Sequence, residues 1–181
     1  MFVVKYTGHF AYIKPWTAVR DGETYSQQFL TPSIIEGIEK KLFPSLINEK
    51  GIKKIVRHKL TNKGISVQQE QAQSRGWEKK KKRAKSIIKR GVMLYPELYL
   101  AFENKKDAEE AASQHICLCR NEDILFPEAE IGEMTDAEFA SLKGFELHFE
   151  KRDKSFLVGY NRFADNAPMY GWLEIDGQDI L

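Results

Sequence analysis

The chain has 181 residues and a formal net charge of +2; 42% of its residues are hydrophobic and 12% are aromatic. These values are typical of a folded domain with a sizeable core, and they exclude a wholly disordered chain. No apolar run approaches the roughly 20 residues that a membrane-spanning helix needs, and the N-terminus lacks the pattern of a signal peptide. We therefore expect a cytoplasmic protein with no membrane partner.

The first third of the chain predicts a strand, a helix and a second strand. Residues 2–13 are rich in β-forming residues, with Gly8 as a bulge or kink. Thr31 and Pro32 are typical of a helix N-terminus, and the apolar residues that follow recur at helical spacing until Pro44. Periodicity alone leaves residues 52–60 ambiguous between helix and strand; their short length after a glycine favours a strand.

Residues 61–90 differ from the rest of the chain. Their first half is polar and rich in Gln, their second half is strongly basic, and Trp77 stands alone among charged residues. Because this stretch has little apolar surface to bury, we expect a mobile loop or a hairpin that projects from the body. Trp77 either stacks on an unpaired base or anchors the loop to the body.

The remaining sequence alternates strand-like and helix-like segments. Residues 93–103 predict a strand in which Pro96 indicates an edge or a bulge. Asn104 predicts the start of a short amphipathic helix, and Thr135 with Glu138 forms a capping box before another. From Phe145 onward the pattern is strand-rich. The order suits an α+β fold with a ferredoxin-like, RRM-type core and a short strand-rich C-terminal portion.

The charges are strongly segregated along the chain. Residues 50–90 hold fifteen of the 28 Lys and Arg residues and only two acids, Glu70 and Glu78, so this window carries +13 while the other 140 residues carry −11. A long basic segment most often meets a phosphate backbone, because each neutralised phosphate releases a counterion. The alternative is a solvated face or a disordered basic arm. The run Lys79–Arg83 cannot point all its side chains one way, which favours an arm that contacts backbone charge and not base identity.

No pattern in the sequence indicates a metal site or a cofactor. Cys117 and Cys119 are two residues apart without two further ligands nearby, so we expect reduced thiols. The four histidines are far apart in sequence, and no pair has metal-binding helical spacing. His58, between Arg57 and Lys59, is either a polar group that faces RNA or a general base.

The segments around the first helix resemble a known family. A strand of the form VxxxGxFAxFxxP, a loop and then YSxxxxTPSxxxGIxxxI resemble the N-terminus of the CRISPR-associated RAMP subunit that caps the 5′ handle of the guide RNA in type I effector complexes, closest to the type I-C version. The matching residues are Gly8, Phe10, Ala11, Pro15, Tyr25, Ser26, Thr31, Pro32, Ser33, Gly37 and Ile38. The resemblance covers residues 2–43 best and extends more loosely over 86–110.

This resemblance implies a RAMP-type domain over residues 1–118 with a protruding basic thumb at about 62–90, and an extension of the same compact unit over 119–181. It also implies guide RNA as a partner, together with the backbone and large subunits of an effector complex, and no small-molecule cofactor. We expect the RNA to be held by the basic residues and the tryptophan of this region. These are Lys53, Lys54, Arg57, Lys59, Arg75, Trp77, Lys79, Lys80, Lys81, Lys82, Arg83, Lys85, Lys89 and Arg90.

The type I-C family also cuts precursor RNA without metal, using a tyrosine after the first helix and a Lys-His pair in a later turn. Here Phe43 occupies the first position and Lys106 lacks the neighbouring histidine. We therefore predict a non-catalytic subunit. Two alternatives stay open: a metal-independent endoribonuclease that uses Tyr25, His58 and Lys106, and a small interaction protein whose acidic face binds another protein.

Overall fold

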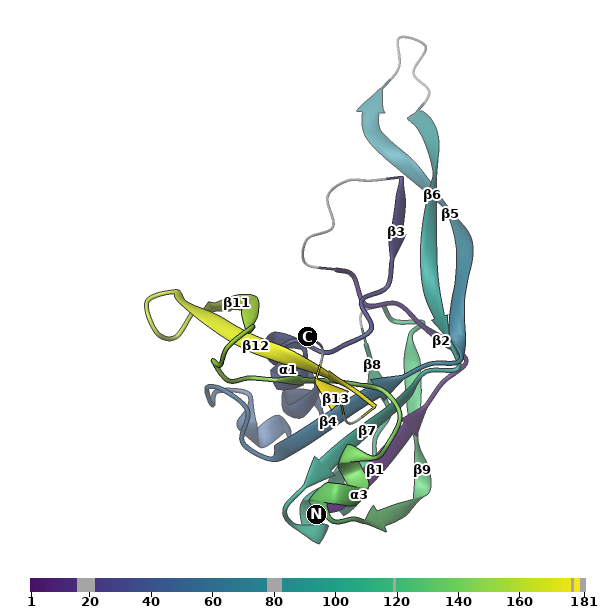
Figure 1. The fold of residues 1–181 in the computed structure, drawn as a ribbon. Helices are drawn as coiled ribbons and strands as arrows, with labels where there is room; N and C mark the ends of the chain where they lie inside the picture. Colours follow the sequence, from purple (N-terminus) through teal and green to yellow (C-terminus); the bar gives the residue numbers. More distant parts are fainter. Residues whose placement is uncertain (16–21, 78–82, 119, 177, 180–181) are drawn as a thin grey trace.

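The protein has an α+β fold built mainly from antiparallel strands (Figure 1). The structure is a computed structural model that describes residues 1–15, 22–77, 83–118, 120–176 and 178–179; for 72–77, 83–86 and 178–179 it describes the backbone. The described part contains a nine-stranded sheet, a four-stranded sheet and three α-helices. The predicted α+β class is thus confirmed.

The elements follow one another as β1 (Phe2–Thr7), β2 (Phe10–Ala11), β3 (Glu23–Tyr25), α1 (Pro32–Leu42), the 3₁₀ turn η1 (Pro44–Leu46), β4 (Ile55–Thr61), β5 (Gly64–Trp77), β6 (Arg83–Leu94), β7 (Glu97–Phe102), α2 (Lys105–Ala112), β8 (Ile116–Cys117), β9 (Ile124–Glu133), α3 (Asp136–Ala140), β10 (Phe145–His148), β11 (Phe156–Asn161), β12 (Ala167–Ile175) and β13 (Gln178–Asp179).

The large sheet has the order β11-β12-β10-β4-β7-β1-β9-β8, with β13 beside β12. In its centre β4, β7, β1 and β9 are all antiparallel neighbours. Helix α1 directs Ile35, Ile38 and Leu42 into the main core, and Ala108 and Ala111 of α2 join the same cluster. The apolar spacing that predicts these helices therefore also predicts which of their faces are buried.

The predicted first strand is divided by Gly8 between two sheets. β1 pairs with β7 and β9, whereas β2 pairs with β6. A Cβ atom on Gly8 would lie 2.6 Å from the carbonyl oxygen of Ile124 and 2.5 Å from Leu125 Cδ2. The chain can bend here only because glycine has no side chain, as the predicted kink requires.

The prediction of one continuous strand over residues 93–103, with Pro96 at an edge or a bulge, is wrong. β6 ends at Leu94, Tyr95 has a positive φ of 47°, and Pro96 lies in the turn before β7. β7 then runs through the middle of the large sheet between β1 and β4. Because Pro96 is in the turn, its missing N–H costs the sheet no hydrogen bond.

Residues 64–94 form a long hairpin. β5 and β6 are paired in antiparallel register from Gly64↔Leu94 to Trp77↔Arg83, and β3 lies parallel to β6 on its other edge. The hairpin stands away from the large sheet, and its polar side chains from Gln68 to Gln71 are exposed (Figure 1). The sequence predicts a loop or a hairpin for this segment, and the structure shows a hairpin.

The C-terminal strands extend the large sheet on the side of β4. β12 pairs with β10 and with β11, and β11 and β12 form an arm on the opposite side of the molecule from β9 (Figure 1). The capping box at α3 is confirmed, since Thr135 Oγ1 accepts from the Glu138 N–H and the Glu138 carboxylate accepts from the Thr135 N–H. None of the described helices has the length and apolar character to cross a bilayer.

Candidate nucleic-acid interface

The basic residues of β4 have partners inside the protein. Arg57 donates to both carboxylate oxygens of Glu146, at 3.0 and 2.6 Å, and its guanidinium lies 4.7 Å from the ring centre of Phe139. The hydrogen bonds to Glu146 raise the pKa of Arg57 despite its partial burial. Lys54 Nζ lies 2.6 Å from Asp107 Oδ1 and 4.1 Å from the ring centre of Phe43.

Lys59 is fully buried. Its Nζ donates to the carbonyl oxygens of Ala140 and Leu142 at 2.9 and 3.1 Å, and more weakly to that of Phe139 at 3.4 Å. These carbonyls end helix α3, so the ammonium group supplies the donors that the last turn lacks. Its three donors are thus directed at the end of α3 and not at solvent, where a phosphate would bind.

His58 is also buried, at 4% exposure, and its ring lies 5.4 Å from that of Phe149 in a stacked arrangement. Desolvation lowers its pKa to about 3, with smaller contributions from His148 and Arg57. Its Nε2 is buried without a hydrogen-bond partner among the described residues. A histidine in this environment is neutral at pH 7 and lies too deep to contact an RNA backbone.

A cleft of about 720 Å³ lies over these strands, and its polar wall is a charge network. His148 Nε2 lies 2.9 Å from Glu174 Oε2, and the His148 ring stacks on Trp172 with ring centres 4.0 Å apart. Glu146 and Glu174 lie directly opposite each other on β10 and β12. Like charges in this register repel, and Arg57 and Lys59 (3.6 Å from Glu174 Oε1) compensate them.

The same network contains one group of three potential metal ligands within the described chain. Ligand atoms of Glu146, His148 and Glu174 lie within 4.8 Å of one another. Both carboxylates already have a cationic partner, Arg57 and Lys59 respectively, so charge balance requires no metal ion here. The spacing Glu-x-His, which places Glu146 and His148 on one face of a strand, was a sequence signal for this cluster. Glu174, the third member, is 26 residues from His148 in the sequence.

A further buried carboxylate, that of Glu39 in α1, was not anticipated from the sequence. It is fully buried and accepts from the backbone N–H groups of Lys53, Lys54 and Ile55. These charge-assisted hydrogen bonds fasten the start of β4 to α1. The Lys53 side chain is exposed beside this contact.

The two described cations near the base of β6 differ in exposure, since Lys89 is half exposed and Arg90 is 22% exposed. The Lys89 side chain is 51% exposed and lies 3.7 Å from Glu23, and Arg90 contacts Glu70 at 3.5 Å and donates to Thr24. The predicted residues Arg75, Trp77, Arg83 and Lys85 lie on paired backbone of β5 and β6. Their side chains, and the whole of Lys79, Lys80, Lys81 and Lys82, lie outside the described residues.

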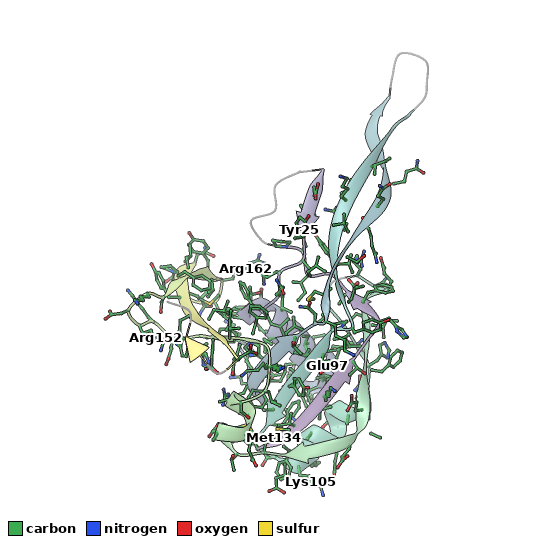
Figure 2. All side chains as sticks on the ribbon, turned by 45° about the vertical axis from the view of Figure 1, so that its right-hand side comes forward. Tyr25, Glu97, Lys105, Met134, Arg152 and Arg162 are labelled. Carbon is green, nitrogen blue, oxygen red and sulfur yellow. The ribbon has the colours of Figure 1, made fainter. Side chains whose placement is uncertain are left out.

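The three residues weighed for catalysis come from separate parts of the fold. Tyr25 is half exposed on β3 and donates to Glu23 at 2.9 Å, which raises the pKa of Tyr25. Figure 2 shows Tyr25 beside the hairpin and Lys105, the neighbour of Lys106, at the far end of the molecule. His58 is buried in β4. Phe43, at the family's tyrosine position, is a fully buried core residue that packs against Phe102.

A larger groove of about 1030 Å³ separates α1 from the β11–β12 arm. Lys40 and Lys50 line one wall, and Tyr160, Arg162 and Phe163 line the other. Tyr160 and Phe163 are 55% and 53% exposed, and Lys50 Nζ lies 5.2 Å from the Phe163 ring centre. Reasoning from the sequence missed this groove because its two walls are more than 100 residues apart.

The cysteines offer no second site. Cys117 is a free thiol of intermediate exposure, 4.0 Å from Lys41 Nζ, and Cys119 lies outside the described residues. The acidic residue Glu128 lies on β9 and contacts Lys5 at 3.1 Å.

Comparison with known proteins identifies the fold. No protein-family model and no curated protein sequence matches the chain. A chain of a CRISPR RNA-guided surveillance complex superposes with a TM-score of 0.55 at 9% sequence identity, over 99% of this chain and 90% of that chain. The functionally uncharacterized protein SMU1763c from Streptococcus mutans gives a TM-score of 0.37 at 13% identity, over 96% of this chain and 86% of that one, too low for an argument. The first likeness shows a shared fold over the whole chain.

Proposed function

We propose that this protein is a guide-RNA-binding subunit of a type I-like CRISPR effector complex, that it grips the 5′ repeat-derived handle, and that it is not catalytic. The observation that carries the proposal is the fold shared over 99% of the chain with a chain of a CRISPR RNA-guided surveillance complex. Guide RNA and the backbone and large subunits of such a complex are the partners that we propose.

The topology supports a ferredoxin-like, RAMP-type core. The succession β1, α1, β4, β7, α2, β9 is a βαββαβ order, and its four strands lie in the spatial order β4-β7-β1-β9 with antiparallel neighbours. This is the arrangement of a split βαβ core. The hairpin β5–β6 is inserted between its second and third strands, which is where we propose the thumb.

The hairpin supports the RNA contact through its charge. Residues 64–94 hold nine Lys and Arg residues against two acids, and the side chains from Gln68 to Gln71 are exposed. We propose that contact is made by Lys53, Lys89, Arg90 and the basic and aromatic residues of positions 75–85. Because Arg57 and Lys59 neutralise buried carboxylates, we assign them a structural role and leave them out of the interface.

Two observations favour a non-catalytic role. Phe43 has no hydroxyl group and is buried, and Figure 2 shows Tyr25 beside the hairpin, far from Lys105, the neighbour of Lys106. A general acid and a general base must both reach the reacting atoms within hydrogen-bonding distance. The three candidate residues do not meet this requirement.

The test is binding of labelled CRISPR-repeat RNA in EDTA, measured by filter binding over a range of salt concentrations and by a denaturing gel. We expect binding without cleavage. Replacing Lys79, Lys80, Lys81 and Lys82 together with Ser should reduce the salt slope by about 0.7 to 1 for each phosphate that is no longer neutralised. The matched control replaces four exposed lysines elsewhere, Lys105, Lys106, Lys143 and Lys154, with Ser.

Each outcome bears on a different part of the proposal. An equal decrease in affinity in the two quadruple variants would contradict a hairpin interface. Discrete cleavage that depends on the 2′-OH would contradict the non-catalytic role. Absence of RNA binding at low salt, both alone and after assembly with the other complex subunits, would overturn the function itself.

A further inference from the structure

We propose that the groove between α1 and the β11–β12 arm holds one unpaired nucleotide of a single-stranded RNA, with its phosphate on Lys50 and Arg162 and its base against Phe163 and Tyr160. The inference rests on the proposed RNA-binding function and adds a second contact, outside the hairpin. The groove's volume, about 1030 Å³, is ample for one nucleotide.

The charge of the groove favours a phosphate. Lys40, Lys50 and Arg162 line it against one acid, Glu36. Glu36 is already engaged, since its Oε1 accepts from Lys40 Nζ at 2.7 Å and from the Gly51 N–H at 3.2 Å. Lys50 and Arg162 make no ion pair with any residue in the described ranges, so both cations are available to an anionic ligand.

The aromatic side chains supply a surface for a base. Tyr160 and Phe163 leave about half of their surface exposed, and both line the same wall of the groove, where a base can contact them. The turn between them is held by a hydrogen bond, in which Asn161 Oδ1 accepts from the Phe163 N–H at 3.0 Å. Stacking on such rings is tolerant of base identity.

The helix wall is open where a ligand would approach. Gly37 lies in the interior of α1 and lines the groove, and a Cβ atom there would meet no atom within 4 Å. Packing therefore gives no reason for a glycine at a position where Ala would make the helix more stable. An unoccupied Cβ position on the wall of a cationic groove lets a ligand lie against the helix backbone.

Nucleic acid accounts for this combination better than a protein segment does. An acidic peptide would use the cations but would not need two exposed rings beside an open helix backbone. A nucleotide uses both the cations and the rings, because only its ribose ring separates its phosphate from its base. The groove is thus matched to single-stranded nucleic acid.

The experiment uses the full-length protein and an eight-nucleotide single-stranded RNA that carries 2-aminopurine at one position, scanned through all eight. Anisotropy reports binding, and quenching of 2-aminopurine reports stacking. We expect quenching at a particular position, and about tenfold weaker binding with loss of quenching in Phe163→Ala, from the usual size of a base–aromatic contact. Arg162→Ala should weaken binding with a smaller salt slope.

Matched controls separate the groove from the rest of the surface. Phe126→Ala removes a ring that is 59% exposed on β9, and Lys105→Ala removes one exposed charge on α2. Both should bind RNA as the unmodified protein does, and thermal melting should show that all four variants are folded.

The groove inference can fail while the proposed function stands. This is the conclusion if Phe163→Ala and Arg162→Ala keep full affinity and quenching while the quadruple Ser variant of Lys79–Lys82 does not bind. If the groove variants keep RNA binding but no longer associate with another complex subunit, the groove is a protein-binding site and the inference is overturned. If the unmodified protein binds no RNA in any form, the inference and the proposed function fail together.

Discussion

The basic residues of β4 and Lys89 of the hairpin strand β6 lie in one basic stretch of sequence but make opposite contacts. Arg57 and Lys59 point into the junction of β4 with β10 and α3, where they neutralise Glu146 and Glu174. Lys89 of β6 is half exposed, and among the described residues its one ion-pair contact is a long one to Glu23. The net charge of residues 50–90 in the sequence is therefore larger than the charge that a binding partner can contact.

The difference follows from the position of each strand. β4 is covered on its outer side by the C-terminal strands, so its cations must find internal partners or remain uncompensated. β6 belongs to a hairpin that stands away from the sheet, so its cations can remain solvated (Figure 1). Four variants test this comparison, from the largest expected effect to the smallest.

Replacing Lys59 with Met should have the largest effect, a decrease of about 3 kcal/mol in the free energy of unfolding. The substitution preserves most of the side-chain volume but leaves the carbonyls of Ala140 and Leu142 without their donor and Glu174 without its cation. Urea unfolding measures the decrease. Lys89→Met, which removes the same group from an exposed site, should change stability by no more than about 0.5 kcal/mol.

Equal stabilities for Lys59→Met and Lys89→Met would show that the ammonium of Lys59 is dispensable. In that case the internal contacts of Lys59 would not be needed for folding, and they would no longer be a reason to exclude Lys59 from the RNA interface.

Local sequence patterns predicted the individual helices and strands whose signals lie within a few neighbouring residues. Helix α1, the start of α2 and the capping box of α3 were anticipated from caps and periodicity, and strand β4 from its short length after a glycine. The basic segment was anticipated as a loop or a hairpin, and it is a hairpin. The single strand over residues 93–103 was wrong because Pro96 marks a turn between two sheets, which no local pattern distinguishes from a bulge.

The contacts that decide the roles of the charges come from distant segments. Lys59 finds its acceptors about 80 residues away in α3, and Arg57 finds Glu146 89 residues away in β10. The groove beside α1 likewise joins Lys50 to Phe163. Sequence reasoning could identify these residue types but not their partners, because the pairing depends on the sheet order.

The next largest effect concerns His58, which should make the fold sensitive to acid. Its folded pKa of about 3 lies below the unfolded value of 6.5, so the unfolded chain binds the proton more readily. Stability from this residue is complete above pH 6.5 and decreases as the pH falls toward 3. Between pH 7 and pH 5 we expect a decrease of about 2 kcal/mol, measured by urea unfolding at each pH.

The control for this prediction is His58→Phe, which cannot be protonated and can still stack on Phe149. Its stability should depend less on pH over the same window. If the two proteins show parallel pH profiles, His58 is not the source of the pH dependence.

A smaller effect should come from Gly91, where the hairpin meets β3. A Cβ atom at this position would overlap the ring of Tyr25. Gly91→Ala should therefore displace the ring and weaken the pairing of β3 with β6, at a cost of about 1 kcal/mol. Gly22→Ala, at a position with no atom within 4 Å of the added Cβ, serves as the control. Equal stabilities for the two variants would show that Tyr25 does not fasten the hairpin to the body.

The smallest expected effect is also the only gain. Gly37→Ala should stabilise the protein by about 0.5 to 1 kcal/mol, because the added methyl group meets no neighbour and alanine favours the helix. The same variant should bind the eight-nucleotide RNA more weakly, since the methyl group intrudes on the groove. If Gly37→Ala is more stable but binds RNA with unchanged affinity, ligand binding does not explain the glycine at this position. If Gly37→Ala raises the stability and weakens RNA binding, the glycine lowers the stability of the helix but is needed for binding in the groove.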